Sequence, residues 1–176
     1  MKYVVRKPYL NFEKEENWLN EMSAKGMALT DYSWCRYVFE DCEKGKYIYR
    51  IELLENIPKN PVSIAYIKFL EDTGVEFVAS YMRWVYFRKR AADGPFDLYS
   101  DIDSKIRYYR KIRSFWTAFA AMELTIGFAN VLLGIINSIN FYMGLFVLLV
   151  GFIILSLRHN IAKKIKNLCR EKKIRE

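Results

Sequence analysis

The sequence has little of what metal and disulfide sites require: one histidine and three cysteines in 176 residues. His159 and the cysteines at positions 35, 42 and 169 form no ligand spacing typical of zinc, so we expect no metal. The odd number of cysteines with no close pair argues against a disulfide framework and fits a reducing compartment. Nucleophile-elbow, Walker and dinucleotide-binding motifs are also missing. We therefore expect no catalytic residues, no cofactor and no enzyme.

An excess of basic charge is missing from the first hundred residues, which carry 15 basic and 15 acidic side chains. Residues 101–176 carry 13 basic and 5 acidic ones, so the whole formal net charge of +8 flanks the hydrophobic segments. We interpret this excess as a membrane-topology signal and expect no nucleic-acid partner. The opening MKYVVRKPYLNF contains no apolar core of signal-peptide length, so export of the first domain is not expected.

Two long apolar runs are present in the second half of the chain. As helices, residues 115–136 would extend about 33 Å and residues 141–157 about 25 Å, which suits two membrane spans joined by a tight turn. Lys and Arg cluster before the first run and after the second, and the turn carries no charge, so both termini are expected in the cytoplasm. The sequence thus predicts a multi-pass membrane protein that contacts the lipid bilayer, with membrane-surface basic residues Arg110, Lys111, Arg113, Arg158, Lys163 and Lys164.

Glu123 interrupts the first apolar run, and a carboxylate at membrane depth is costly. It heads a polar and small stripe whose spacing of 4, 3, 4 and 3 places it on one helix face: Glu123, Gly127, Asn130, Gly134 and Asn137. In the second run, Gly144 and Gly151 share a face that allows close helix packing. Because neither run contains Lys or Arg, we expect a protonated Glu123 that contacts the other helix. A working carboxyl group is the alternative.

The first part of the chain alternates between strand-like and helix-like periods. Asn11 is expected to cap a helix that stops near Gly26, and Pro61 to open a second helix that stops at Gly74. We expect a β-hairpin of residues 29–40 and 46–54 with Gly45 in its turn, and one long final strand over 75–90. The order β-α-β-β-α-β predicts an α+β, ferredoxin-like cytoplasmic domain, followed by the two-helix transmembrane hairpin.

These elements divide the chain into consecutive segments. We expect the cytoplasmic domain at 1–91, a linker at 92–100, an amphipathic juxtamembrane helix at 101–114, spans at 115–136 and 141–157, and a basic cytoplasmic tail at 158–176. The tail is expected either to lie along anionic lipid as a basic helix or to be disordered.

The predicted final strand is apolar on both faces, although a half-solvated strand would carry polar residues on one. We therefore expect something to cover the second sheet face: a protein partner, a second copy, the juxtamembrane helix or a ligand, with a protein contact favoured. The predicted partner-binding face consists of Tyr49, Tyr81, Met82, Trp84 and Tyr86.

The stretches EENWLNEMSAKGMAL, YVFE and KYIYRIELL resemble the bacterial domain of unknown function 2812 family. The resemblance covers roughly residues 8–90 and depends on Trp18–Leu19, Lys25–Gly26 and the aromatic strand ending in Tyr49–Arg50. Met27 and Val75 stand where the family often has an aromatic residue. The resemblance implies a membrane-anchored bacterial protein without an established activity, often encoded beside PadR-like transcriptional regulators.

Anchoring, a neutral first domain and an apolar sheet face together favour a membrane-anchored cytoplasmic sensor or regulatory adaptor. It would act through protein–protein contacts with a partner or as a homo-oligomer. Two alternatives remain open: a small oligomeric transport or proton-coupled component that uses Glu123, and a structural assembly module. The sequence does not identify a small-molecule ligand.

Overall fold

The computed structural model describes residues 1–99, 101–135 and 137–175. The chain forms two compact units, Met1–Leu98 and Tyr99–Glu176, which are described separately below. Ser100, Ile136 and Glu176, which the expected linker, first span and tail include, lie outside the described residues.

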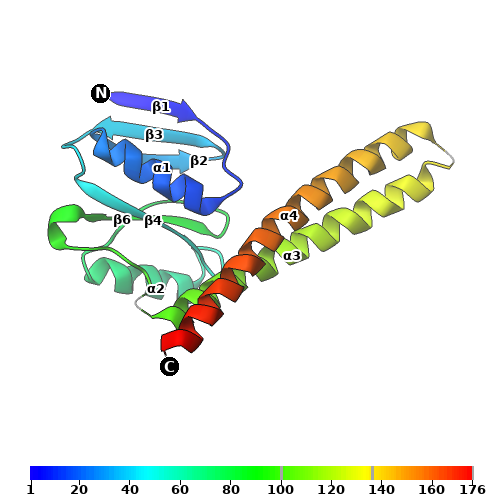
Figure 1. The fold of residues 1–176 in the computed structure, drawn as a ribbon. Helices are drawn as coiled ribbons and strands as arrows, with labels where there is room; N and C mark the ends of the chain where they lie inside the picture. The colour runs from blue at the N-terminus through cyan, green and yellow to red at the C-terminus, as the bar shows by residue number, and fades with distance from the viewer. Residues whose placement is uncertain (100, 136, 176) are drawn as a thin grey trace. The chain divides into compact units, whose positions relative to one another are not determined.

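The first unit is an α+β domain of six strands, two α-helices and one short 3-10 helix (Figure 1). Its strands form two antiparallel three-stranded sheets, in the orders β1-β3-β2 and β4-β6-β5. The elements are β1 (Lys2–Arg6), α1 (Phe12–Ala24), β2 (Met27–Ser33), β3 (Arg36–Asp41), β4 (Tyr47–Leu53), α2 (Pro61–Asp72), β5 (Glu76–Tyr81), β6 (Trp84–Arg90) and η1 (Ala91–Asp93).

The six strands arise from two successive β-α-β-β repeats, β1-α1-β2-β3 and β4-α2-β5-β6. In each repeat the third strand lies between the first and the second. Each helix follows an asparagine whose side chain accepts backbone N–H bonds, Asn11 in the first repeat and Asn60 in the second. Gly26 and Gly74 follow the helices at φ of 87° and 84°. Strand β2 has a register shift between Leu29 and Asp31, and β5 has the equivalent shift 48 residues later, between Phe77 and Ala79.

The expected ferredoxin-like order of four strands is therefore wrong. Residues 29–40 hold two strands separated by a turn at Trp34–Cys35, and residues 75–90 hold two strands separated by a turn at Met82–Arg83. The expected hairpin around Gly45 is also wrong, because β3 pairs with β1 and β2 whereas β4 pairs with β6. Two-residue turns ordinarily contain Gly or Asn. Neither turn does, so no turn signal divided the two long strands.

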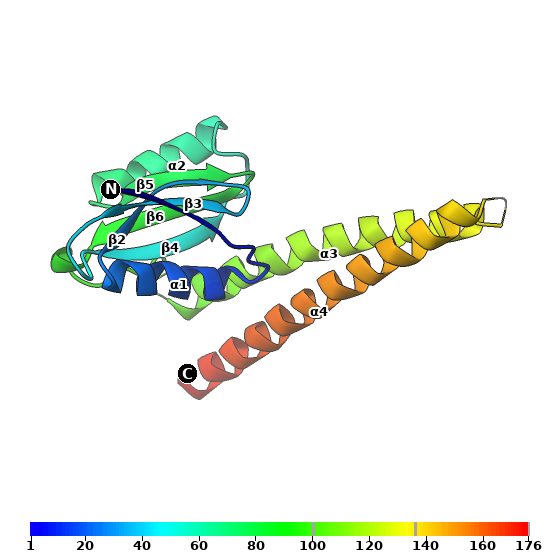
Figure 2. The ribbon, with the colours of Figure 1, turned by 90° about the horizontal axis from the view of Figure 1, so that it is seen from above.

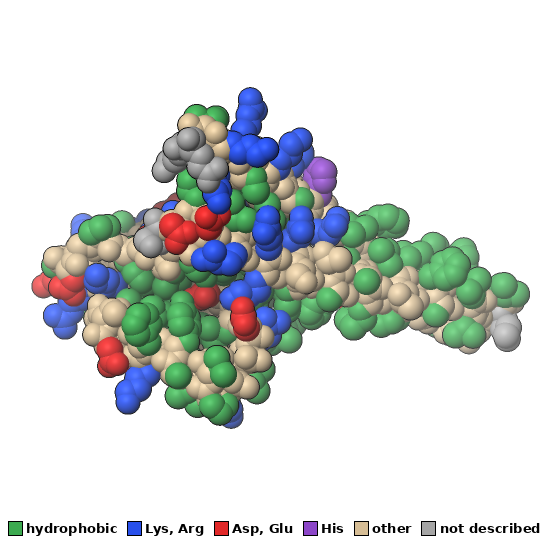
Figure 3. Space-filling model, turned by 90° about the horizontal axis from the view of Figure 1, so that it is seen from below, with side chains coloured by type: hydrophobic (Ala, Val, Ile, Leu, Met, Phe, Trp, Pro, Cys, Tyr) green, Lys and Arg blue, Asp and Glu red, His purple; other side chains and the backbone are tan. Residues whose placement is uncertain are grey.

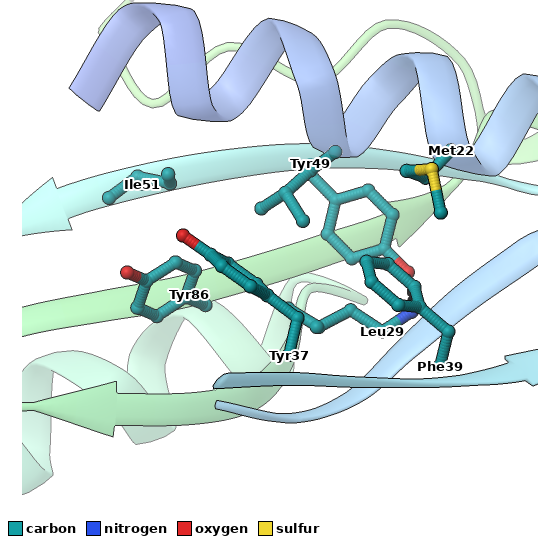
Figure 4. Close-up of a cluster of buried hydrophobic side chains, with 8 residues drawn as sticks. Met22, Leu29, Tyr37, Phe39, Tyr49, Ile51 and Tyr86 are labelled. Carbon is teal, nitrogen blue, oxygen red and sulfur yellow. Dashed lines mark hydrogen bonds between the residues drawn. The ribbon is translucent and has the colours of Figure 1, made fainter. Parts of the chain in front are cut away.

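The two helices lie on opposite faces of the second sheet (Figure 2). Along β6, Tyr86 faces the cluster under α1, whereas Val85 and Phe87 face the cluster that α2 covers. The α1 cluster joins both sheets and contains Leu19, Met22, Leu29, Tyr37, Phe39, Tyr49, Ile51 and Tyr86 (Figure 4). The apolar character of both faces of the last strand is therefore explained by a second helix of the same unit.

Side chains of α1 bond to the outer edge of β4. The Ser23 hydroxyl donates to the Tyr47 carbonyl and accepts from the Tyr47 N–H, at 2.7 and 3.2 Å. The Asn20 amide donates to the Tyr49 carbonyl and accepts from the Tyr49 N–H, at 3.3 and 2.8 Å. Glu16 accepts from the Ile51 N–H at 2.9 Å. These three α1 residues share one helix face, and they satisfy backbone groups that an edge strand otherwise leaves exposed.

The second unit is a pair of long helices, α3 (Ile102–Leu133) and α4 (Ser138–Arg175). Both are long and apolar enough to cross a membrane. The expected juxtamembrane helix and first span form one continuous helix, and the expected tail continues α4. At the end of the pair where α3 begins and α4 finishes, Lys172 forms an ion pair with Asp103 at 2.9 Å. The Lys164 ammonium lies 4.9 Å from the centre of the Tyr109 ring. The tail is thus helical and packed against α3.

The expected linker is partly included in the α+β unit. Residues 91–93 form η1, and Phe96 is buried in the cluster that α2 covers, where Leu98 also packs. The apolar Phe96 side chain therefore extends the core of the unit past residue 91.

Candidate functional site

The turns between β2 and β3 and between β5 and β6 lie beside each other at one end of the α+β unit. The ring of Trp34 in the first turn lies 5.7 Å from the ring of Tyr81, which immediately precedes the second turn. Tyr32 also contacts Tyr81, at 6.1 Å between ring centres. We call Trp34, Cys35, Tyr81 and Met82 the paired turns. Strands β2 and β5 contact each other, so the turns that follow these strands lie together.

The paired turns combine exposed apolar side chains with an unfavourable backbone. Trp34 is 74% exposed and Met82 is 58% exposed. Trp34, Cys35 and Met82 have φ of 34°, 60° and 55°, and no other described non-glycine residue has positive φ. This conformation costs roughly 1–2 kcal/mol per residue. Because the Trp34 and Met82 side chains remain largely exposed, they gain little hydrophobic stabilisation that would offset this cost. Strain of this kind is concentrated at functional positions, so it motivates a functional hypothesis.

The aromatic core supports the first turn from below. The Tyr32 hydroxyl accepts a hydrogen bond from the Cys35 N–H at 3.4 Å. Its ring lies 4.7 Å from that of Tyr37 and 4.5 Å from that of Tyr86. Burial raises the pKa of Tyr32. Tilted ring contacts with Tyr37 and Tyr86 therefore hold the turn in place.

Beneath these rings, α1 places a carboxyl group in the core. The hydroxyls of Tyr37 and Tyr86 point toward the same end of the cluster (Figure 4), and each donates to Glu15 Oε1 at 2.6 Å. Burial raises the pKa of Glu15, and the two hydrogen bonds oppose that shift. Glu15 thus links α1 to both sheets through one oxygen atom.

The structure separates the residues of the predicted sheet face. Tyr49 and Tyr86 are 0% and 2% exposed, so their assignment to a partner-binding face is wrong; α1 covers them. Trp84 is half-buried, and its ring stacks on that of Phe12 at 5.6 Å. Only Tyr81 and Met82 belong to the paired turns. Sequence reasoning missed Trp34, although the 48-residue spacing of Gly26 and Gly74 is a signal of the repeat that brings it there.

The glycines of the predicted membrane stripe and the two predicted packing glycines of the second run lie where α3 and α4 make contact. A Cβ atom at Gly127 would lie 2.9 Å from Leu148 Cγ, and one at Gly144 would lie 2.6 Å from the Val131 backbone nitrogen. Gly134 and Gly151 likewise face the opposite helix. The small residues therefore allow the two helix backbones to approach closely.

The polar members of the stripe form no hydrogen bond across this contact within the described parts of the chain. Asn130 donates to Ile126 O of its own helix at 2.9 Å, and Asn137 accepts from the nearby Ile139 N–H at 3.0 Å. Glu123 is half-buried, with its Cβ 3.6 Å from where a Cβ at Gly151 would lie.

The predicted basic residues lie at the end of the hairpin where α3 begins and α4 finishes. Arg158 Nε donates to Thr117 Oγ1 across the two helices at 2.9 Å. Figure 3 shows Lys and Arg side chains gathered beside a long surface that carries hydrophobic side chains and no visible charged ones. Among residues 1–99, 101–135 and 137–175, no group of three or more His, Cys, Asp or Glu side chains is placed to hold a metal ion.

A family model described as "Protein of unknown function (DUF2812)" matches residues 11–121. The chain belongs to this family. The match to DUF2812 starts at Asn11, the N-cap of α1, and continues into α3, so it includes both paired turns and the start of the helical hairpin. It confirms the resemblance seen in EENWLNEMSAKGMAL and KYIYRIELL. Comparisons with curated proteins and with solved structures gave no match.

Proposed function

We propose that this DUF2812 protein is a membrane-anchored cytoplasmic sensor or regulatory adaptor whose α+β unit binds a protein partner through the paired turns. Two observations support the anchor: both long helices have apolar surfaces, and the basic excess lies at one end of their hairpin. With that end on the cytoplasmic side of a bacterial cell membrane, the chain crosses the bilayer twice and both termini are cytoplasmic.

The observation that carries the adaptor proposal is the exposure of Trp34 and Met82 on a left-handed backbone. A tryptophan exposed on a well-supported turn contributes little to folding and much to a contact, and Trp is enriched among the residues that dominate protein–protein binding. The rings of Tyr32 and Tyr81 hold the surface in place, which limits the entropy lost on binding.

A protein partner fits this surface better than a nucleic acid or a small ligand. The first hundred residues carry equal numbers of basic and acidic side chains, whereas nucleic-acid binding requires a basic excess. The Trp34 and Met82 side chains project into solvent, whereas small ligands occupy concave sites.

Replacing Trp34 by glycine is expected to weaken partner binding without lowering the stability of the fold. Glycine adopts positive φ without strain, so the free energy of unfolding is expected to stay the same or to rise by up to about 1 kcal/mol. Partner recovery should fall at least tenfold. The measurement is quantitative mass spectrometry of proteins crosslinked to the full-length chain in native membranes, together with denaturant unfolding in detergent.

Trp34→Phe serves as the matched control, because it keeps both the strain and an aromatic ring. Most of the recovered partner should remain with this variant. Equal partner recovery by Trp34→Gly and the unaltered chain would refute a role for the paired turns in binding.

A further inference from the structure

The outer edge of β1 is open. The Lys7 N–H donates to Cys35 O at 2.9 Å, in line with the β1–β3 pairing. In an antiparallel pair, bonded positions alternate, so Tyr3 and Val5 also bond toward β3. Lys2, Val4 and Arg6 therefore present their backbone N–H and C=O groups to the opposite edge. Within the described residues of the α+β unit, no hydrogen bond reaches these groups.

The equivalent edge in the second repeat is sealed. Register matching places Lys2 and Val4 at the positions of Tyr49 and Ile51 in β4. There, Asn20 and Glu16 of α1 bond to the outward backbone groups. Among the described elements of the unit no helix does the same for β1, because α1 bonds to β4 and α2 packs on the second sheet against Val75, Val85 and Phe87. The fold thus protects one of two equivalent edges and leaves the other open.

The charges on β1 indicate what this edge would accept. Lys2 and Arg6 are exposed on one face with Val4 between them, which is 54% exposed. The Lys2 ammonium lies 3.5 Å from Glu40 of β3, and a solvent-exposed pair of this kind contributes little energy, so Lys2 can exchange it for an acidic side chain of a bound strand. Arg6 lies opposite Arg36 in the register, and none of the described acidic groups pairs with it. In an antiparallel pair of two β1 strands, Lys2 of one copy would lie opposite Arg6 of the other, which like-charge repulsion disfavours.

We propose that the outer edge of β1 binds an extended acidic peptide segment of a partner protein by strand addition. The bound segment runs antiparallel to β1 and carries Asp or Glu opposite Lys2 and Arg6, with an apolar residue opposite Val4. Its motif is acidic-x-apolar-x-acidic, because alternate residues of a strand share a face. Backbone hydrogen bonds supply affinity, and the two charge pairs select the sequence. The proposal goes beyond the paired turns and does not require them to bind.

The test uses the full-length chain in detergent micelles with a fluorescent peptide, acetyl-Thr-Glu-Thr-Val-Thr-Glu-Thr-amide. A second peptide with Lys in place of both Glu residues is the charge control. Fluorescence anisotropy is expected to show at least tenfold tighter binding of the acidic peptide. Val4→Pro should weaken it at least tenfold, because proline removes the outward N–H and leaves the β1–β3 bonds intact. Val4→Thr is the matched control and should bind as the unaltered chain does.

A charge-reversed variant, Lys2→Glu with Arg6→Glu, provides a second test in case Val4→Pro disturbs folding. It is expected to prefer the lysine peptide. Equal binding of the two peptides, or no saturable binding of the acidic one, would overturn the proposal. So would a dimer that Val4→Pro dissociates and the acidic peptide does not, since a second copy would then occupy the edge. The Trp34→Gly experiment tests the paired turns, which are a different surface. The proposal for the paired turns and the proposal for the β1 edge can therefore fail independently.

Discussion

Replacing Glu15 with alanine is expected to lower the free energy of unfolding of the α+β unit by about 3 kcal/mol. The substitution leaves the hydroxyls of Tyr37 and Tyr86 in the core without their acceptor, and both tyrosines are almost fully buried. It also removes the group that ties α1 to both sheets. Urea unfolding followed by circular dichroism and tyrosine fluorescence measures the change, and a loss below about 1 kcal/mol would contradict the importance of this network.

Glu15→Gln provides the control, because its side-chain oxygen still accepts from the tyrosines and it does not titrate. Burial raises the pKa of Glu15 above its ordinary value of 4.5, so the native state binds this proton more tightly than the unfolded state. The resulting stabilisation is fully present below about pH 4.5 and is lost as the pH rises through the folded pKa. Glu15→Gln should therefore reduce the fall of stability above pH 4.5. Some fall should remain, because burial also raises the pKa of Glu16.

Replacing Gly144 with leucine is expected to force α3 and α4 apart. A Cβ atom there would lie 2.6 Å from the Val131 nitrogen and 2.8 Å from the Gly127 oxygen, which are backbone atoms that no rotamer change can move. Overpacking of this kind costs about 1–3 kcal/mol or more, and relief requires displacement of a whole helix. The separation of the two helices should extend to the end of the hairpin where α3 begins and α4 finishes.

Spin labels at cysteines that replace Thr117 and Arg158, in a chain otherwise free of cysteine, report the separation of the helices in lipid nanodiscs. Their distance distribution should be short and narrow in the parent chain, and longer or broader with Gly144→Leu. Met143→Leu changes the adjacent, exposed position and should leave the distribution unaltered. An unchanged distribution with Gly144→Leu would contradict the close glycine contact.

Local signals in the sequence predicted several element boundaries correctly. Asn11 caps α1, Pro61 opens α2, and Gly26 and Gly74 follow the two helices as expected. These predictions succeed because capping and positive φ are determined within a few residues. The near-continuous apolar runs likewise predicted the two long apolar helices.

The arrangement of the sheets was not predictable from the same local signals. Trp34–Cys35 and Met82–Arg83 form tight turns without Gly or Asn, so two hairpins read as two long strands. That error hid the repeat, and with it the placement of the helices on opposite faces. Tyr49 and Tyr86 consequently looked exposed. The paired turns depend on contacts between segments about 48 residues apart, which a local pattern does not contain.

The central proposal is that a cytoplasmic α+β unit is held at a membrane by the α3–α4 hairpin. Single cysteines at Lys59 and Ile139, both exposed, test it most directly in intact cells with a membrane-impermeant maleimide. Ile139→Cys should react in intact cells. Lys59→Cys should react only after permeabilisation, and both variants should remain in the membrane fraction after alkaline washing. Labelling of Lys59→Cys in intact cells, or release of the chain by the wash, would contradict the account.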